Sequence, residues 1–158
     1  MKIVIMMLTI LIWLQTCRHP CFRDRNEEIE REKVANTIDA GIGWVKNKDL
    51  DLLYKVISQD STYLCVNPGN RIVYGFDQFK ESVPFWMDDN FQYIKHEIRD
   101  LKITFSKSGE VAWFFCRLND INTWRGEPAS WENVRWTGVL EKMKCRWVIR
   151  QQHFSFEK

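Results

Sequence analysis

The side chains best suited to chemistry in this sequence are one histidine, one arginine and one aspartate. Histidine is the side chain best suited to exchange protons near neutral pH, so His153 could give or take a proton there. The planar guanidinium of Arg135 could bind a carboxylate or an enolate. Asp60 could act as a general base if burial raised its pKa. Together these groups would suit proton transfer beside a carbonyl.

Each of these residues also has a structural interpretation. His153 could be a neutral histidine that is hydrogen-bonded within the fold, or it could only add polarity to a pocket. Asp60 could make a cap or turn contact. Arg135 could form an ion pair with one of three carboxylates: Glu132, Asp120 or Glu97.

Composition narrows the function classes. The chain has 158 residues, of which 45% are hydrophobic, so it can form one globular domain with a sizeable core. A formal net charge of +2 without clustered basic residues argues against nucleic-acid binding. The three histidines are scattered and no Cys-x-x-Cys occurs, so we expect no metal site and no cofactor. Cys65 and Cys116 lie in apolar stretches, and we expect both to be buried, unpaired thiols.

The N-terminus is typical of an export signal. Lys2 precedes an apolar run from Ile3 to Leu14, which is too short to cross a bilayer as a helix. The following residues, up to Cys17, resemble a relaxed bacterial lipobox. We therefore expect a signal peptide over residues 1–16, a lipid on Cys17 as the only membrane contact, and a tether over residues 17–26. Cleavage to a soluble periplasmic or extracellular protein, or an uncleaved membrane-associated helix, are the alternatives.

The elements that must position the candidate residues begin with helices. Apolar residues at three- and four-residue steps predict a helix from Glu27 to about Lys46, and Asp49 is a plausible N-cap for a second helix. A third helix is expected over residues 77–87, with Pro84 as a possible kink. Two short extended segments, residues 61–66 and 71–74, lie between the second and third helices around an Asn-Pro-Gly-Asn turn.

After residue 93 the apolar pattern changes to a period of two. It predicts strands over residues 93–106 and 110–118, a polar loop over 119–130, and a hairpin of residues 131–142 and 146–156. Three N-terminal helices followed by an antiparallel meander predict an α+β domain over residues 27–158. In this fold class the helices would pack on one side of a curved, mostly antiparallel sheet.

Several short motifs, in order, resemble one family. They are Trp44-Val45, Asp49 to Leu53, Asp60 to Tyr63, Asn67-Pro68-Gly69, Gly75 to Phe79, Val111 to Phe114, Thr137 to Lys142, and Trp147 to Ser155. This order resembles the SnoaL-like branch of the nuclear-transport-factor-2-like superfamily. The resemblance implies a cystatin-like cone, in which a bent sheet encloses a pocket closed by helices and which is often dimeric. Members include ketosteroid isomerases, polyketide cyclases, dehydratases and non-catalytic modules, so the fold does not settle the function.

The resemblance and strand parity together predict a pocket. The odd-numbered side chains of the last strand line the cavity of the family, and the first short strand meets that cavity near Asp60. The predicted catalytic residues are His153 and Asp60. The predicted lining residues are Tyr63, Trp86, Trp113, Phe115, Arg117, Arg135, Thr137, Gln151 and His153.

The even-numbered side chains would then lie on the outer face of the sheet. Phe114, Trp136 and Val148 would be exposed there, so we expect a homodimer that covers this face. A monomer in solution scattering would contradict this expectation.

The sequence favours an exported domain that binds a small apolar or anionic molecule without catalysis. The first alternative is an isomerase, cyclase or dehydratase that moves a proton with His153 or Asp60. The second alternative is a dimerising structural or interaction module.

Overall fold

The computed structural model describes residues 27–69 and 71–157. The predicted signal peptide and Cys17 lie outside this range. The helical elements are α1 (Glu27–Gly43), the short 3-10 helix η2 (Trp44–Asn47), α2 (Leu50–Val56), α3 (Gly75–Lys80) and α4 (Val83–Met87). The strands are β1 (Leu64–Val66), β2 (Ile72–Tyr74), β3 (Phe91–Phe105), β4 (Val111–Trp124), β5 (Glu127–Pro128), β6 (Trp131–Met143) and β7 (Arg146–Ser155). None of the helices described is long and apolar enough to span a membrane.

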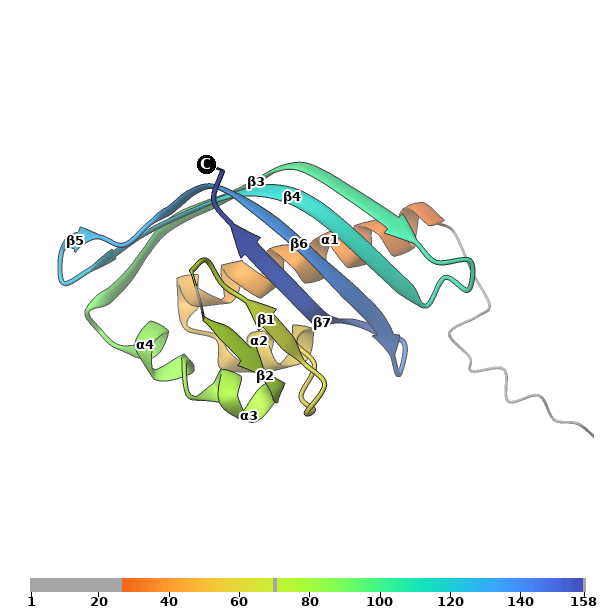
Figure 1. The fold of residues 1–158 in the computed structure, drawn as a ribbon, viewed down its shortest axis with the longest axis horizontal. Coiled ribbons are helices and arrows are strands. Elements are labelled where there is room, and N and C mark those ends of the chain that lie inside the picture. The colour runs from red at the N-terminus through yellow and green to blue at the C-terminus, as the bar shows by residue number, and fades with distance from the viewer. Residues whose placement is uncertain (1–26, 70, 158) are drawn as a thin grey trace, which may run out of the picture.

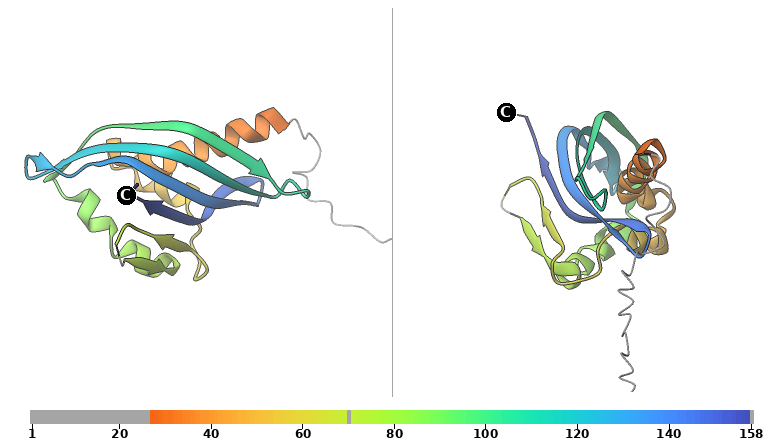
Figure 2. Two further views of the ribbon diagram at one scale, coloured as in Figure 1. Left: turned by 45° about the horizontal axis from the view of Figure 1, so that its top comes forward. Right: turned by 90° about the vertical axis from the view of Figure 1, so that its right-hand side faces the viewer.

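The strands form one curved sheet in the order β2-β1-β7-β6-β4-β3, with β5 paired to β4. All pairs are antiparallel except β1 with β7. The long strands β3, β4, β6 and β7 curl together, and α1 lies along the face toward which they bend (Figure 1, Figure 2). The short β1–β2 hairpin and helices α2, α3 and α4 gather below one end of this sheet (Figure 1). The predicted α+β cone is confirmed.

The helix ends follow local sequence signals. Lys48 adopts a left-handed conformation after η2, and the side chain of Asp49 accepts a hydrogen bond from the Leu52 amide at 2.9 Å. The predicted N-cap is therefore confirmed. The single third helix was wrong, because the chain forms two short helices separated by a turn at Ser82. Pro84 has no amide hydrogen to donate to the preceding helical turn, so α3 cannot continue through it.

The expected polar loop over residues 119–130 was also wrong. β4 continues to Trp124, and Phe91 pairs with Trp124 across the β3–β4 ladder. The chain then reverses at Arg125 and Gly126, both at positive φ, and returns as β5. Residues 119–124 are extended although they are mostly polar, because β3 forms hydrogen bonds with their backbone amide and carbonyl groups. β4 and β5 form an arm at one end of the molecule (Figure 1).

On strands β4 and β6, the inward face of the sheet is the even-numbered one. On β4 and β6 the core contains Ala112, Phe114, Cys116, Leu118, Val134, Trp136 and Leu140. The predicted odd-numbered inner face was therefore wrong on these strands, because their even-numbered side chains pack in the core cluster that includes residues of α1. The expectation that Phe114, Trp136 and Val148 are exposed was wrong as well, since all three are buried.

β7 changes parity along its length. Trp147 and Ile149 are buried as expected, but the β6–β7 register shifts between Val139 and Leu140. After this irregularity the buried residues are Gln152 and Phe154. A shift of one residue exchanges the two faces of a strand.

Two buried cysteines remain unpaired, as the sequence predicted. Cys65 lies on β1 and Cys116 at the centre of β4, and both are free thiols. Burial raises the pKa of Cys65 to about 11 and that of Cys116 to about 12.

Glu30 is a buried carboxylate on α1. It accepts hydrogen bonds from the indole Nε1 of Trp147 at 2.7 Å and from Lys33 at 2.9 Å, and Lys142 Nζ lies 2.8 Å away. Burial alone would raise the pKa of Glu30, but these donors outweigh that effect and lower the pKa to about 2. The charged cluster therefore fastens α1 to β6 and β7.

Candidate functional site

A cavity of about 500 Å³ lies between the inner face of the sheet and the segments that cover it. Its helical walls are the end of α1, η2, α3 and α4. Its other walls are the β1–β2 hairpin, the far halves of β4 and β7, and the first residues of β3 and β6. Seven of the described aromatic residues line it: Trp44, Phe79, Phe85, Trp86, Phe91, Trp131 and Phe154. A concave apolar cavity of this size can enclose most of a small organic molecule.

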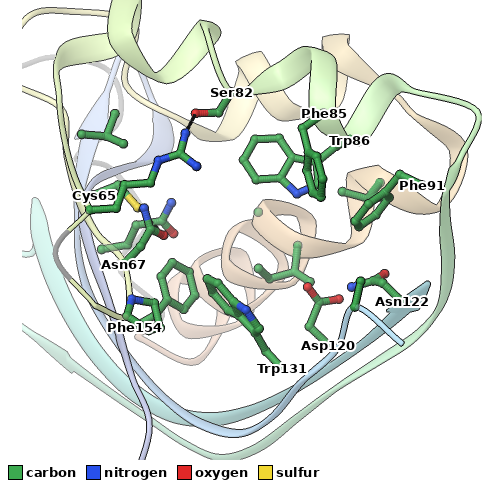
Figure 3. A pocket seen from close by; sticks show the side chains of 18 of the residues that line it. Cys65, Asn67, Ser82, Phe85, Trp86, Phe91, Asp120, Asn122, Trp131 and Phe154 are labelled. Atoms are coloured by element: carbon green, nitrogen blue, oxygen red, sulfur yellow. Dashed lines mark hydrogen bonds between the residues drawn. The ribbon is translucent and has the colours of Figure 1, made fainter. Parts of the chain in front are cut away.

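Local irregularities bring several of these aromatic residues to the pocket. Trp131 turns inward because Asn133 adopts a positive φ and the β4–β6 register shifts beside it. Phe154 points inward because of the parity change in β7. Figure 3 shows Trp131 and Phe154 on one side of the cavity and Trp86 across from them.

Polar groups occupy two separate parts of the pocket wall. Asp120 and Asn122 lie together on β4 (Figure 3). Asn67 and Ser82 lie on the other side, where Arg71 Nη2 donates a hydrogen bond to Ser82 Oγ at 2.6 Å (Figure 3). The pocket is therefore apolar in its middle and polar at both ends.

Asp120 is the carboxyl group that lines the pocket. Burial raises its pKa above the usual value, although hydrogen bonding by Asn122 and the nearby His96 oppose the increase. His96 lies opposite Asp120 across the β3–β4 ladder, and its two ring nitrogens are hydrogen-bonded to the Tyr93 hydroxyl and the Asp39 carboxylate. A carboxyl with a raised pKa inside an apolar cavity can exchange a proton closer to neutral pH than an ordinary aspartate.

Two buried amide side chains present unpartnered oxygens. Asn122 is 3% exposed and Gln152 is 6% exposed, and both line the pocket. Gln152 donates from Nε2 to the hydroxyl of Tyr63 at 2.6 Å, which leaves its Oε1 without a donor. Asn122 Oδ1 likewise has no donor. A buried acceptor without a donor costs about 1–3 kcal/mol, so these oxygens suit a ligand hydroxyl or amine.

Most of the predicted pocket residues do not line this cavity. Trp86 lines it, and Tyr63 is buried behind Gln152. The placement of the others in the pocket was wrong, because the odd-numbered positions lie on the outer face of the sheet: Trp113, Phe115, Arg117, Arg135, Thr137, Gln151 and His153.

The predicted pair of proton-transfer residues is not assembled. His153 is half-buried on the outer face, between Thr137 and Val66 on the neighbouring strands. Asp60 accepts hydrogen bonds from the Thr62 side chain at 2.6 Å and forms an ion pair with Arg150. These contacts, with that of Thr62 strongest, hold the pKa of Asp60 well below its usual range. Asp60 therefore makes a turn contact, which is the structural interpretation of this residue given above.

Arg135 also has a structural role. Its Nη2 donates to the backbone carbonyl of Phe156 at 2.9 Å, on the outer side of the sheet. None of the ion pairs within 4.0 Å in the described residues involves Arg135.

Sequence reasoning missed Asp120, Asn122 and Gln152. The first two fell in a segment interpreted as a loop, and the third was assigned to the outer face. A signal for the first two was present, because the even-numbered pattern of β4 continues from Leu118 through Asp120 to Asn122. In the described part of the chain, no three histidine, cysteine, aspartate or glutamate residues gather in a group that could hold a metal ion.

A curved sheet that closes a pocket with three short helices and one long one is the architecture of nuclear-transport-factor-2-like proteins. A model of the SnoaL-like domain matches residues 34–157, and the chain belongs to this family. The comparison with curated proteins found no match.

Solved structures share the fold at low sequence identity. A protein of Streptomyces avermitilis, proposed to be a dehydratase of the NTF2-like family, is 19% identical with a TM-score of 0.71, covering 84% of this chain and 99% of its own. A proposed scytalone dehydratase of Novosphingobium aromaticivorans is 13% identical with a TM-score of 0.69, covering 81% and 84%. An NTF2-like superfamily protein of Salmonella enterica is 15% identical with a TM-score of 0.67, covering 84% and 94%.

Proposed function

We propose that this protein binds a small, largely aromatic molecule in the cavity between the sheet and its helices. The observation that carries the proposal is the cavity of about 500 Å³, whose aromatic walls contain a few buried polar groups. Such a surface would be costly to leave exposed to water, and flat aromatic ligands can stack against tryptophan and phenylalanine rings.

A direct binding experiment tests this function. We expect 2-naphthol to bind the wild-type protein with a Kd in the micromolar range and to raise its melting temperature. Ala129 lines the cavity, and Ala129→Trp would place an indole in it. This variant should lose about tenfold or more of the affinity, measured by calorimetry and by tryptophan fluorescence.

A matched variant controls for the added tryptophan. Asn36 is exposed on α1, away from the cavity, so Asn36→Trp should bind 2-naphthol like the wild type. Binding that Ala129→Trp leaves unchanged would contradict the proposal, provided that the variant melts in a single transition.

A second candidate function is proton transfer by Asp120. It is supported by the raised pKa of this carboxyl inside the cavity and by two structural neighbours proposed to be dehydratases. The ionised carboxylate would remove a proton beside a carbonyl group, which leaves an enolate and a neutral carboxyl group. The carboxyl group would then return a proton to the enolate carbon, either the original proton or one exchanged with solvent water.

Exchange of hydrogen for deuterium tests the second function. In D2O, the wild type should accelerate exchange at the carbon beside the carbonyl of 1-tetralone, and Asp120→Asn should reduce this acceleration by about 100-fold or more. Because the pKa of Asp120 is raised, the acceleration should fall, as the pH decreases, at a higher pH than for an ordinary aspartate. Asp100→Asn removes an exposed carboxyl outside the pocket and should have no effect. Equal exchange with and without protein would contradict catalysis.

Export and self-association are separate proposals. We propose that residues 1–16 direct export and that Cys17 carries a lipid; a mature protein that begins before Cys17 would contradict this.

We also propose that a second copy covers the outer sheet face around Trp113 and Phe115, which replace the aromatic residues first expected there. Sedimentation as a monomer would contradict the dimer.

A further inference from the structure

The two ends of the pocket differ in hydrogen-bonding character. Figure 3 shows Ser82 and Asn67 at one end, Asp120 and Asn122 at the other, and the ring of Trp131 between them. The end near Ser82 carries the guanidinium group of Arg71, whereas Asn122 at the other end offers an acceptor without a partner. A ligand that satisfies both ends must carry different groups at its own two ends.

The donor end contains a guanidinium group without an anionic partner. Arg71 belongs to the β1–β2 hairpin, lines the cavity, and has no carboxylate within 4.0 Å among the described residues. It donates to Ser82 Oγ at 2.6 Å, and Ser82 is only 7% exposed. Because the Ser82 oxygen accepts from Arg71, its own hydrogen is left for another acceptor. Two donors, one of them charged, therefore face the cavity together.

The other end needs a donor from the ligand. Asn122 Oδ1 is buried in the wall there without a partner. The other unpartnered oxygen, Gln152 Oε1, lies beside Cys65 at the opposite end. Asp120 beside Asn122 would repel an anion there once it is ionised. A hydroxyl group suits this end, because it can donate to Asn122.

We infer that the ligand is a hydroxylated aromatic carboxylate, with its carboxylate on Arg71 and Ser82 and its hydroxyl on Asn122. This inference rests on the proposed binding function and specifies the chemical class and direction of the ligand. The aromatic body would lie between Trp86 and Trp131, in the apolar middle of the cavity. Guanidinium groups suit carboxylates because their planar donors match the two carboxylate oxygens.

Three related probes test the inference by calorimetry: 6-hydroxy-2-naphthoate, 2-naphthoate and 2-naphthol. In the wild type, the hydroxynaphthoate should bind about fivefold or more tightly than either of the others. Arg71→Gln should lower the affinity for both carboxylate probes by about tenfold or more and should change the affinity for 2-naphthol by less than about twofold. Arg146→Gln removes the same charge from an exposed site outside the pocket and should change none of the three affinities.

The hydroxyl end is tested by the same probes. In Asn122→Ala the hydroxynaphthoate should lose its advantage over 2-naphthoate, because the acceptor is gone. The comparison of these two probes in the wild type tests the hydroxyl contact without any substitution, should Asn122→Ala fail to fold.

The outcomes separate this inference from the proposed function. If 2-naphthol binds as tightly as the hydroxynaphthoate and Arg71→Gln changes nothing, the inferred ligand class is overturned while binding in the cavity stands. If the two carboxylates bind equally in the wild type, the hydroxyl contact is overturned. If none of the three probes binds, both the inference and the proposed function fail.

Discussion

Replacing Trp136 with alanine should lower the free energy of unfolding by about 3–5 kcal/mol, which is typical of a large aromatic side chain lost from a core. Trp136 is 0% exposed. Its ring stacks on Phe154 at a centroid distance of 5.2 Å and meets Phe114 edge-on at 5.1 Å. Gly138 leaves room for Phe114, because a Cβ there would lie 2.6 Å from the ring. Urea unfolding followed by circular dichroism measures the loss.

Two variants accompany this measurement. Tyr74→Ala removes an aromatic ring that is 67% exposed, so it should change the stability by about 0.5 kcal/mol or less. Trp136→Phe should cost less than Trp136→Ala, because it keeps a ring in the core and removes an indole Nε1 that has no hydrogen-bond partner. If Trp136→Ala were no more costly than Tyr74→Ala, the inward assignment of the even-numbered face would be wrong.

The protein should lose about 3 kcal/mol of stability through Glu30 alone as the pH falls from about 4.5 to 2. The pKa of Glu30 is lower in the folded state than in the unfolded chain, so the unfolded chain binds the proton first. The stabilisation is therefore complete above the ordinary pKa of 4.5 and is lost as the pH falls through the folded pKa of about 2. Glu30→Gln should flatten this part of the pH profile, measured by urea unfolding at each pH.

A control on the same helix isolates the effect. Glu32 is exposed, so Glu32→Gln should keep the acid sensitivity of the wild type. Asp60 also has a lowered pKa and adds to the acid response, but it is present in all three proteins. A profile for Glu30→Gln that parallels the wild type would show that the cluster with Trp147 and Lys142 does not stabilise the folded state.

Much of the fold could be predicted because its signals are local. The N-cap at Asp49, the turn after Asn67 and the period-two pattern of the long strands all depend on neighbours in the sequence. The buried thiols of Cys65 and Cys116 followed from their apolar surroundings. The ordered motifs added the family, and with it the expectation of a cone around a pocket.

The composition of the pocket could not be predicted, because it depends on strand parity and irregular pairing. Both faces of β4 and β6 carry aromatic residues, such as Trp113 outside and Trp136 inside, so the pattern alone did not identify the inner face. On β7 the register shift near Arg150 exchanged the faces midway, which placed Gln152 rather than His153 inside. Which side chains face inward is determined by packing against α1 and by pairing between strands, and such contacts are not local in sequence.

The rates at which the two buried thiols react can be used to measure opening motions of the protein. A thiol reacts with an alkylating reagent only as the thiolate and only when the reagent can reach it. Cys65 and Cys116 are buried and have raised pKa values, so neither thiol should react while the protein stays closed. Cys65 belongs to a three-residue strand at the pocket wall, whereas Cys116 lies at the centre of the long ladder. The labelling rate of Cys65, resolved by peptide mass, therefore reports brief opening of the wall, and that of Cys116 reports loss of the whole sheet.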